Sequence, residues 1–148
     1  MLNSFDFANM LITKDFLDHL NDEAKASPRG RVHYDLRTQA FESATSDWKD
    51  TSQRMLNVLT PGTIIPIHRH LDTSETVICI RGAVEEVFFD ATGAEIEHFV
   101  LRYGSDCSTV QVPRGVYHTC RCLEPGSVIF EAKDRAYNSE TTEDFLKI

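Results

Sequence analysis

The stretch that decides the fold runs from Gly62 to Gly82 and reads GTIIPIHRHLDTSETVICIRG. His68 and His70 stand two residues apart in a β-prone segment, and Glu75 follows four residues after the second histidine. Alternate side chains of an extended strand point to the same face, so both imidazoles can bind one ion. A short turn is expected to bring Glu75 back on the neighbouring strand. The residues expected to follow on the same face are Val77, Cys79 and Arg81.

A second informative stretch, PRGVYHTCRC from Pro113 to Cys122, contains a turn that delivers His118 at the start of another strand. Three neutral imidazoles and one carboxylate suit one divalent transition metal, with coordination positions left for water or substrate. The metal ligands predicted on this basis are His68, His70, Glu75 and His118. These ligand types are compatible with Zn, Fe, Ni or Mn and do not distinguish among them.

The other three histidines, each taken singly, are more typical of exposed or hydrogen-bonded residues than of ligands. His19 is expected on the polar side of a helix. His98 alternates with Ile96 and Val100 and is expected to face a core. His33 is also expected to be an ordinary exposed or hydrogen-bonded histidine, and it is in addition a candidate substrate contact.

Eight short β-prone runs fill the chain after Val32, separated by turns rich in Gly and Pro. The expected strands are residues 54–59, 63–68, 76–80, 84–89, 95–101, 108–112, 115–120 and 127–133. The intervals leave no room for connecting helices, which excludes a parallel α/β sheet and favours an all-β sandwich or closed barrel. Ahead of the strands, Thr13 can cap a helix from Lys14 to Lys25, which Pro28 and Gly30 end.

The two histidine stretches resemble the two motifs of the cupin superfamily. The first motif, G-x5-H-x-H-x4-E-x6-G, is matched at Gly62, His68, His70, Glu75 and Gly82. The second, P-x-G-x2-H-x3-N, is matched at Pro113, Gly115 and His118, whereas Cys122 stands where the family has Asn. Over nearly its whole length the chain is similar to the small WbuC-type cupin metalloproteins, which bacteria often encode near surface-polysaccharide genes.

This resemblance implies an all-β fold, a single cupin (a double-stranded β-helix or jelly-roll barrel) with a short N-terminal helix. We expect residues 1–30 to form a helical segment packed on the barrel and residues 31–137 to form the barrel itself. Residues 138–148 are expected to be a tail, either a short helix or loosely held. Small cupins commonly pair through barrel faces, so a homodimer is expected.

The charge balance argues against polyanionic partners. The chain has 15 Lys and Arg against 23 Asp and Glu, a net charge of −8, and no block of consecutive basic residues. Nucleic acid and membrane partners are therefore not expected, because both need concentrated positive charge. The first twenty residues lack the features of a secretory signal, and the four cysteines form no disulfide or zinc-finger pattern, which indicates reduced thiols in the cytoplasm.

The last predicted strand carries two charged residues, Glu131 and Lys133, that alternate with Phe130 and Ala132. Only one of the two sets can face the barrel interior. We favour the charged set, because the strand resembles a family hallmark. Lys133 would then neutralise a substrate anion or act as an acid, and Glu131 would act as a base.

Further candidates for substrate contact follow from charge and from strand alternation. Arginine offers a planar donor fork for a carboxylate or phosphate, although a solvated barrel rim explains such residues equally well. The candidates of this kind are Arg29, Arg31, His33 and Arg54. Alternation also places Cys79, Cys120 and Cys122 in the interior, where packing is favoured over reactivity.

Three kinds of function remain open at this stage. The favoured one is a metal-dependent enzyme performing isomerase, epimerase or lyase chemistry on a small, polar, anionic substrate, with sugar derivatives among the candidates. An Fe(II) dioxygenase is the alternative enzyme class. A non-catalytic, metal-dependent carbohydrate or small-molecule binding module is the second kind, and a purely structural metal ion is the third.

Overall fold

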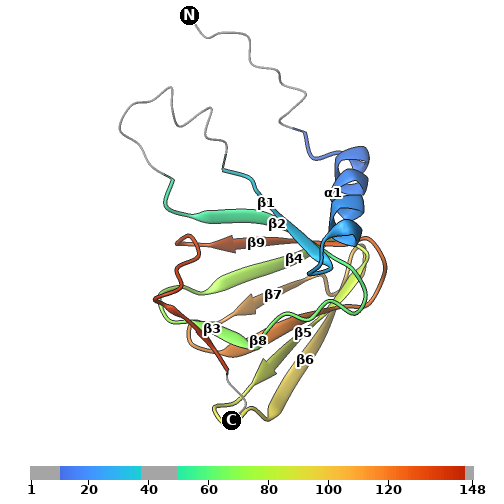
Figure 1. Cartoon of the computed structure of the whole chain (residues 1–148). Helices are drawn as coiled ribbons and strands as arrows, with labels where there is room; N and C mark the ends of the chain where they lie inside the picture. The colour runs from blue at the N-terminus through green and yellow to red at the C-terminus, as the bar shows by residue number, and fades with distance from the viewer. Residues whose placement is uncertain (1–10, 38–49, 146–148) are drawn as a thin grey trace, which may run out of the picture.

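A computed structural model describes residues 11–37 and 50–145 of the chain (Figure 1). One helix, α1 (Lys14–Ala26), precedes the strands. The strands are β1 (Arg31–Asp35), β2 (Gln53–Leu59), β3 (His68–His70), β4 (Glu75–Arg81), β5 (Ala83–Phe89), β6 (Glu95–Arg102), β7 (Thr109–Val112), β8 (Tyr117–Cys122), β9 (Ser127–Lys133) and β10 (Thr142–Asp144). No helix in these residues has the length and apolar character needed to cross a lipid bilayer.

The strands form two five-stranded antiparallel sheets. The first has the order β1-β2-β9-β4-β7 and the second the order β10-β3-β8-β5-β6. Both sheets contribute to one buried apolar core, which includes Leu59, Val77, Val84, Leu101 and Ile129. Strands adjacent in space are mostly distant in sequence, so the sheets close into a jelly-roll barrel, as expected.

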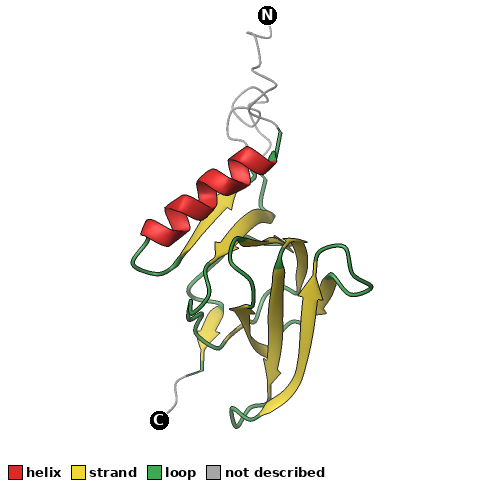
Figure 2. Ribbon diagram, turned by 90° about the vertical axis from the view of Figure 1, so that its right-hand side faces the viewer, coloured by secondary structure: helices red, strands yellow, loops and turns green. Residues whose placement is uncertain are grey.

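Helix α1 covers the outer face of the first sheet (Figure 2). The Thr13 hydroxyl accepts a hydrogen bond from the Phe16 N–H and caps the helix. Leu17 and Leu20 are buried in a second apolar cluster, against Leu56 of β2. The sheet is therefore apolar on this outer face and more polar inside.

Several local expectations were wrong. Residues 63–67 form no strand, and the extended segment begins only at His68. Glu75 does not return on a neighbouring strand, because the chain crosses after β3 to the opposite sheet, and the carboxylate faces the histidines across the barrel. A register shift between Cys79 and Arg81 turns the Arg81 side chain outward, where it contacts Asp18 of α1.

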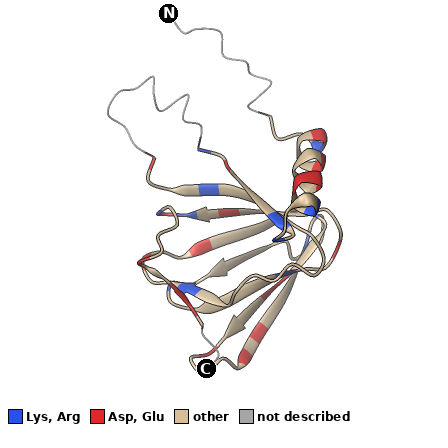
Figure 3. Cartoon of the chain, viewed as in Figure 1, with Lys and Arg blue, Asp and Glu red and all other residues tan. Residues whose placement is uncertain are grey.

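Two further expectations concern β6 and the tail. Strand β6 has the opposite phase to that expected: Phe99 and Leu101 pack inward, so His98 is exposed. The tail is not a short helix in its described part, because Thr142–Asp144 pairs with β3 as strand β10. Charged residues of both signs are interspersed over the strands, whereas α1 is mostly acidic (Figure 3).

Candidate metal centre

A cavity of about 500 Å³ opens between the two sheets and is lined by His68, His70 and Glu75 of the predicted metal site. His68 and His70 come from β3, His118 from β8 and Glu75 from the start of β4. One ring nitrogen from each of the three histidines lies within 4.8 Å of the other two. The Glu75 carboxylate completes the group, with its oxygens 3.4 Å from His70 Nε2 and 3.9 Å from His118 Nε2.

The imidazoles are oriented by contacts at their other nitrogen. His68 Nδ1 donates to the Pro66 carbonyl at 2.8 Å, and His118 Nδ1 donates to the Val116 carbonyl at 2.9 Å. His70 Nδ1 lies 3.1 Å from the Thr142 hydroxyl. The two carbonyls can only accept, so they leave the Nε2 lone pairs of His68 and His118 free to bind a metal, and the Thr142 hydroxyl holds the ring of His70 in place.

One buried atom in this cluster, His118 Nε2, lacks a hydrogen-bond partner in the described part of the chain, in a side chain that is 3% exposed. An unpaired polar atom at such depth is costly unless it has a ligand. The donor set, its orientation and this unpaired nitrogen fit a divalent transition metal held by the three histidines and Glu75.

Burial keeps His68 and His118 in the neutral form that binds metal. Burial, and then the neighbouring His118, lowers the pKa of His68 to about 4, and burial also lowers the pKa of His118. Burial alone would raise the pKa of Glu75, but contact with His70 and the charge of Lys133 outweigh it and lower the pKa to about 2. At neutral pH the site therefore presents a carboxylate at Glu75 and neutral imidazoles at His68 and His118.

Glu131 and Lys133 face the cavity, as favoured above, while Phe130 packs outward beneath α1. Lys133 Nζ lies 3.3 Å from both Glu75 Oε2 and His70 Nε2, so the ammonium group neutralises the buried carboxylate. Burial, and then the charge of Glu75, raises the pKa of Glu131 to about 7. Glu131 can thus hold or release a proton near neutral pH.

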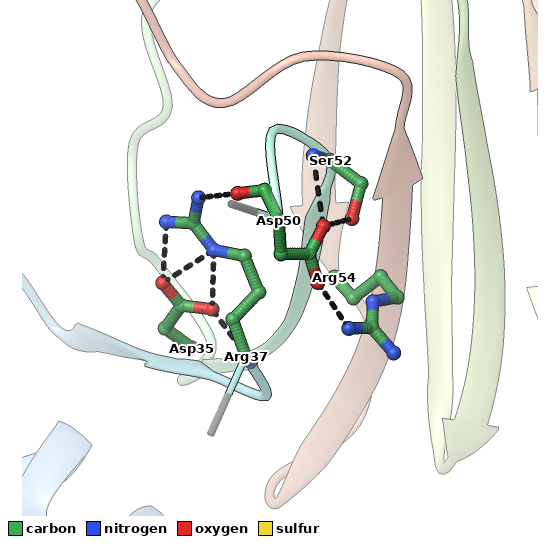
Figure 4. Close-up of polar contacts among 5 residues, drawn as sticks. All are labelled: Asp35, Arg37, Asp50, Ser52 and Arg54. Atoms are coloured by element: carbon green, nitrogen blue, oxygen red, sulfur yellow. Dashed lines mark hydrogen bonds and ion pairs between the residues drawn. The ribbon is translucent and has the colours of Figure 1, made fainter. Parts of the chain in front are cut away.

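Among the predicted substrate contacts, Arg29, Arg31 and His33 line the cavity and Arg54 does not. Arg54 alternates with the inward residues of β2 and forms an ion pair with Asp50 (Figure 4). The same Asp50 accepts hydrogen bonds from the Ser52 N–H and hydroxyl. Arg54 therefore helps to anchor the chain ahead of β2, and its expected place at the site is corrected.

The three interior cysteines lie outside this cavity. Cys79, Cys120 and Cys122 are part of the core or pack against it. Burial raises the pKa of each thiol, most strongly for Cys120. Cys120 and Cys122 also border a separate hollow of about 640 Å³. The thiols are therefore packing residues in an unreactive state, and the expected substrate contact has no support in their position.

Sequence reasoning missed three residues at or near the site. Thr142 and Asp144 line the cavity from β10, and no local pattern indicates their pairing with β3. Glu86 of β5 is fully buried inside the barrel, opposite Cys120, and its Oε2 has no hydrogen-bond partner among the described residues. Burial, and then the charges of Glu75 and Glu131, raises the pKa of Glu86 well above its ordinary value. Its alternation with apolar Val84 and Phe88 was the available signal.

Comparisons with known proteins agree with this fold. The chain is similar to the capsular polysaccharide assembling protein CapF from Staphylococcus aureus, with 21% identity, a TM-score of 0.57, and coverage of 68% of this chain and 30% of CapF. Oxalate decarboxylase from Bacillus subtilis shows 18% identity, a TM-score of 0.55, and coverage of 78% and 27%. Oxalate oxidase in complex with the substrate analogue glycolate shows 16% identity, a TM-score of 0.58, and coverage of 75% and 54%. The chain thus spans less than a third of CapF and about half of oxalate oxidase.

These structural relatives are cupins, and the two facing sheets with a histidine cluster between them give this chain the single-domain cupin fold. More particularly, residues 12–101 match the family described as "Domain of unknown function (DUF6016)", and the chain belongs to that family. No curated protein matches the sequence significantly.

Proposed function

We propose that the protein binds one divalent transition metal through His68, His70, Glu75 and His118 and is an enzyme acting on a small, polar, anionic molecule. The observation that carries the proposal is the convergence of these side chains, with His118 Nε2 buried and unpaired among the described residues, beside a cavity open to substrate. Adjacent to them, Lys133 and Glu131 supply a cation and a proton-exchanging carboxyl.

A bound divalent ion would polarise a carbonyl or hydroxyl oxygen of the substrate. The chain's own residues supply the remaining steps. Glu131, with its pKa near neutrality, takes or returns the proton. Lys133 holds the negative charge that develops next to it. Gln53 and Asn57, which line the same wall, offer amide hydrogen bonds to substrate hydroxyl groups.

This arrangement suits isomerase, epimerase or lyase chemistry on a sugar-derived acid, with an Fe(II) dioxygenase as the alternative. The similarity to WbuC-type cupins supports a role in surface-polysaccharide metabolism. The name of CapF, a capsular polysaccharide assembling protein, supports it as well.

A homodimer in the cytoplasm completes the proposal. It is supported by the small-cupin resemblance and by exposed Ile96 and Val100 on β6, and light scattering coupled to size exclusion tests it.

The decisive experiment is elemental analysis of the full chain purified without added metal. We expect close to one transition-metal ion per chain, and its loss in His68→Ala and Glu75→Ala with the β-sheet circular dichroism retained. Wild-type protein without stoichiometric metal would contradict the proposal, and unfolding of both variants would indicate a structural ion. Iron would favour dioxygen chemistry, whereas zinc, nickel or manganese would favour proton-transfer chemistry.

The enzymatic part is tested separately with keto sugars, sugar acids and dioxygen as candidate substrates. Turnover by the metal-loaded wild type that falls at least 100-fold in Glu131→Gln, with unchanged metal content, would support it. A compound that raises the melting temperature but is not consumed would instead identify a binding module.

A further inference from the structure

One wall of the cavity carries two guanidinium groups that form no ion pair with the described residues. Arg31 lies on β1 opposite Leu59, Arg29 precedes it by two residues, and both line the cavity. Within residues 11–37 and 50–145, neither forms an ion pair, whereas most other arginines do. The paired ones are Arg37, Arg54, Arg69, Arg81, Arg102 and Arg121. Arg29 and Arg31 are therefore exceptions, and each has a positive charge that no ion pair with the described residues neutralises.

The carboxyl groups near this wall do not balance its two positive charges. Glu131 of β9 acts on Arg31, but with a pKa of about 7 it is only partly ionised at neutral pH. Asp35, on the same face of β1, binds Arg37 at 2.6 Å, and Glu75 is matched by Lys133. Asp144 lies on the other sheet, in register with His68. Burial, and then the charge of Arg29, lowers the pKa of Arg31, whereas the charge of Glu131 raises it. A further negative charge beside the half-buried Arg31 and the exposed Arg29 is therefore favourable.

We propose that Arg29 and Arg31 form the binding site for the phosphate of a small phosphate monoester. A monoester carries a charge of about −1.5 to −2 at pH 7 and three acceptor oxygens, which two planar donor forks can bind and neutralise together. A carboxylate has one charge and two oxygens, so it would leave one arginine unmatched. His33, the next residue on this face of β1, adds a ring N–H donor at the cavity wall.

This inference refines the proposed function and rests on it, because it takes the cavity to be the substrate site. The phosphate lies at the β1 wall, and the organic part extends past Gln53 and Asn57 toward the histidine cluster. The volume of about 500 Å³ lies in the range typical of small-molecule sites. The substrate class is thus a phosphorylated polar metabolite.

Calorimetric titration of the full chain as purified, with inorganic phosphate, methyl phosphate and acetate at constant ionic strength, tests the inference. The test variant is Arg29→Met/Arg31→Met. The matched control is Arg114→Met/Arg135→Met, which removes two exposed arginines outside the cavity. Metal content and circular dichroism are measured for each protein. We expect the test variant to bind both phosphates at least tenfold more weakly and the control to change less than twofold.

Acetate is expected to bind the wild type at least tenfold more weakly than phosphate. Equal phosphate binding by the test variant, or acetate binding as strong as phosphate binding, would overturn the proposal. Arg31→Lys keeps the positive charge but removes the planar guanidinium, and it provides a test even if the double variant fails to fold. Its affinity for phosphate should fall several-fold, and wild-type affinity would show that the guanidinium geometry is not required. His68→Ala should lose metal yet keep phosphate binding, which separates this proposal from the metal site. Loss of both would place the phosphate on the metal.

Discussion

The Thr142→Val substitution tests whether the C-terminal strand controls the metal site. Valine keeps the shape and strand preference of threonine but removes the hydroxyl that lies 3.1 Å from His70 Nδ1. His70 is only 5% exposed, so no water can fully replace this partner. Loss of a partner that orients a ligand histidine typically costs tenfold to 100-fold in metal affinity, or roughly 1.4 to 2.7 kcal/mol.

The assay is competition for Zn²⁺ as the probe metal against a chromophoric chelator under reducing conditions. Thr142→Ser, which keeps the hydroxyl, should bind within threefold of the wild type. Thr141→Val is the control, because the neighbouring Thr141 hydroxyl donates to the Asn138 carbonyl and not to a histidine. Nitrogen chemical shifts of His70 should show its tautomer equilibrium shifted in Thr142→Val. Wild-type Zn²⁺ affinity with an unchanged tautomer in Thr142→Val would refute the reasoning, as would equal losses in the serine and valine variants.

Three further outcomes follow from the structure. Glu131 ionises near pH 4.5 in the unfolded chain and near pH 7 in the folded one, so it lowers the free energy of unfolding as the pH rises between these values. Relative to the wild type, Glu131→Gln should therefore gain up to about 3 kcal/mol in free energy of unfolding between pH 4.5 and pH 8, measured by urea unfolding. A difference that does not depend on pH would contradict this. Gly82→Ala should lower the free energy of unfolding by about 2 to 4 kcal/mol, because φ is +73° and a Cβ would lie 2.4 Å from the Ser127 hydroxyl. Gly104→Ala is the matched control: φ is +74° but the space is open, so the loss should be only about 1 to 2 kcal/mol. Equal urea midpoints for the two variants would argue against the steric cause. A thiol reagent should modify exposed Cys107 rapidly and buried Cys120 only after unfolding, and equal rates followed by mass spectrometry would show that the interior is open.

The ligand pattern was predictable because strand alternation is a local property. Two histidines at spacing two on an extended segment share a face in any sheet, and the inward phase of Glu131 and Lys133 follows the same rule. The helix start at Thr13 was equally local, since one hydroxyl caps one turn.

Side-chain positions were predicted wrongly where the inward and outward alternation of a strand is interrupted or differs from that expected, or where segments distant in sequence pack together. The register shift before Arg81 redirects that side chain to Asp18, and no residue type announces it. Arg54 resembled a substrate contact by its charge, but the sheet phase turns it away from the cavity. His98 was assigned to the wrong face for the same reason.

By itself, the sequence of this protein determined the all-β class, the helix and the residues able to bind a metal, because each depends on residue types and on spacings of a few positions. Only the tertiary structure decided that Glu75 approaches the histidines from the opposite sheet and that Thr142 orients His70. It also decided that Arg29 and Arg31 line one wall of the same cavity. These juxtapositions join segments up to 72 residues apart, and they arise from burying one core between two sheets rather than from any local preference.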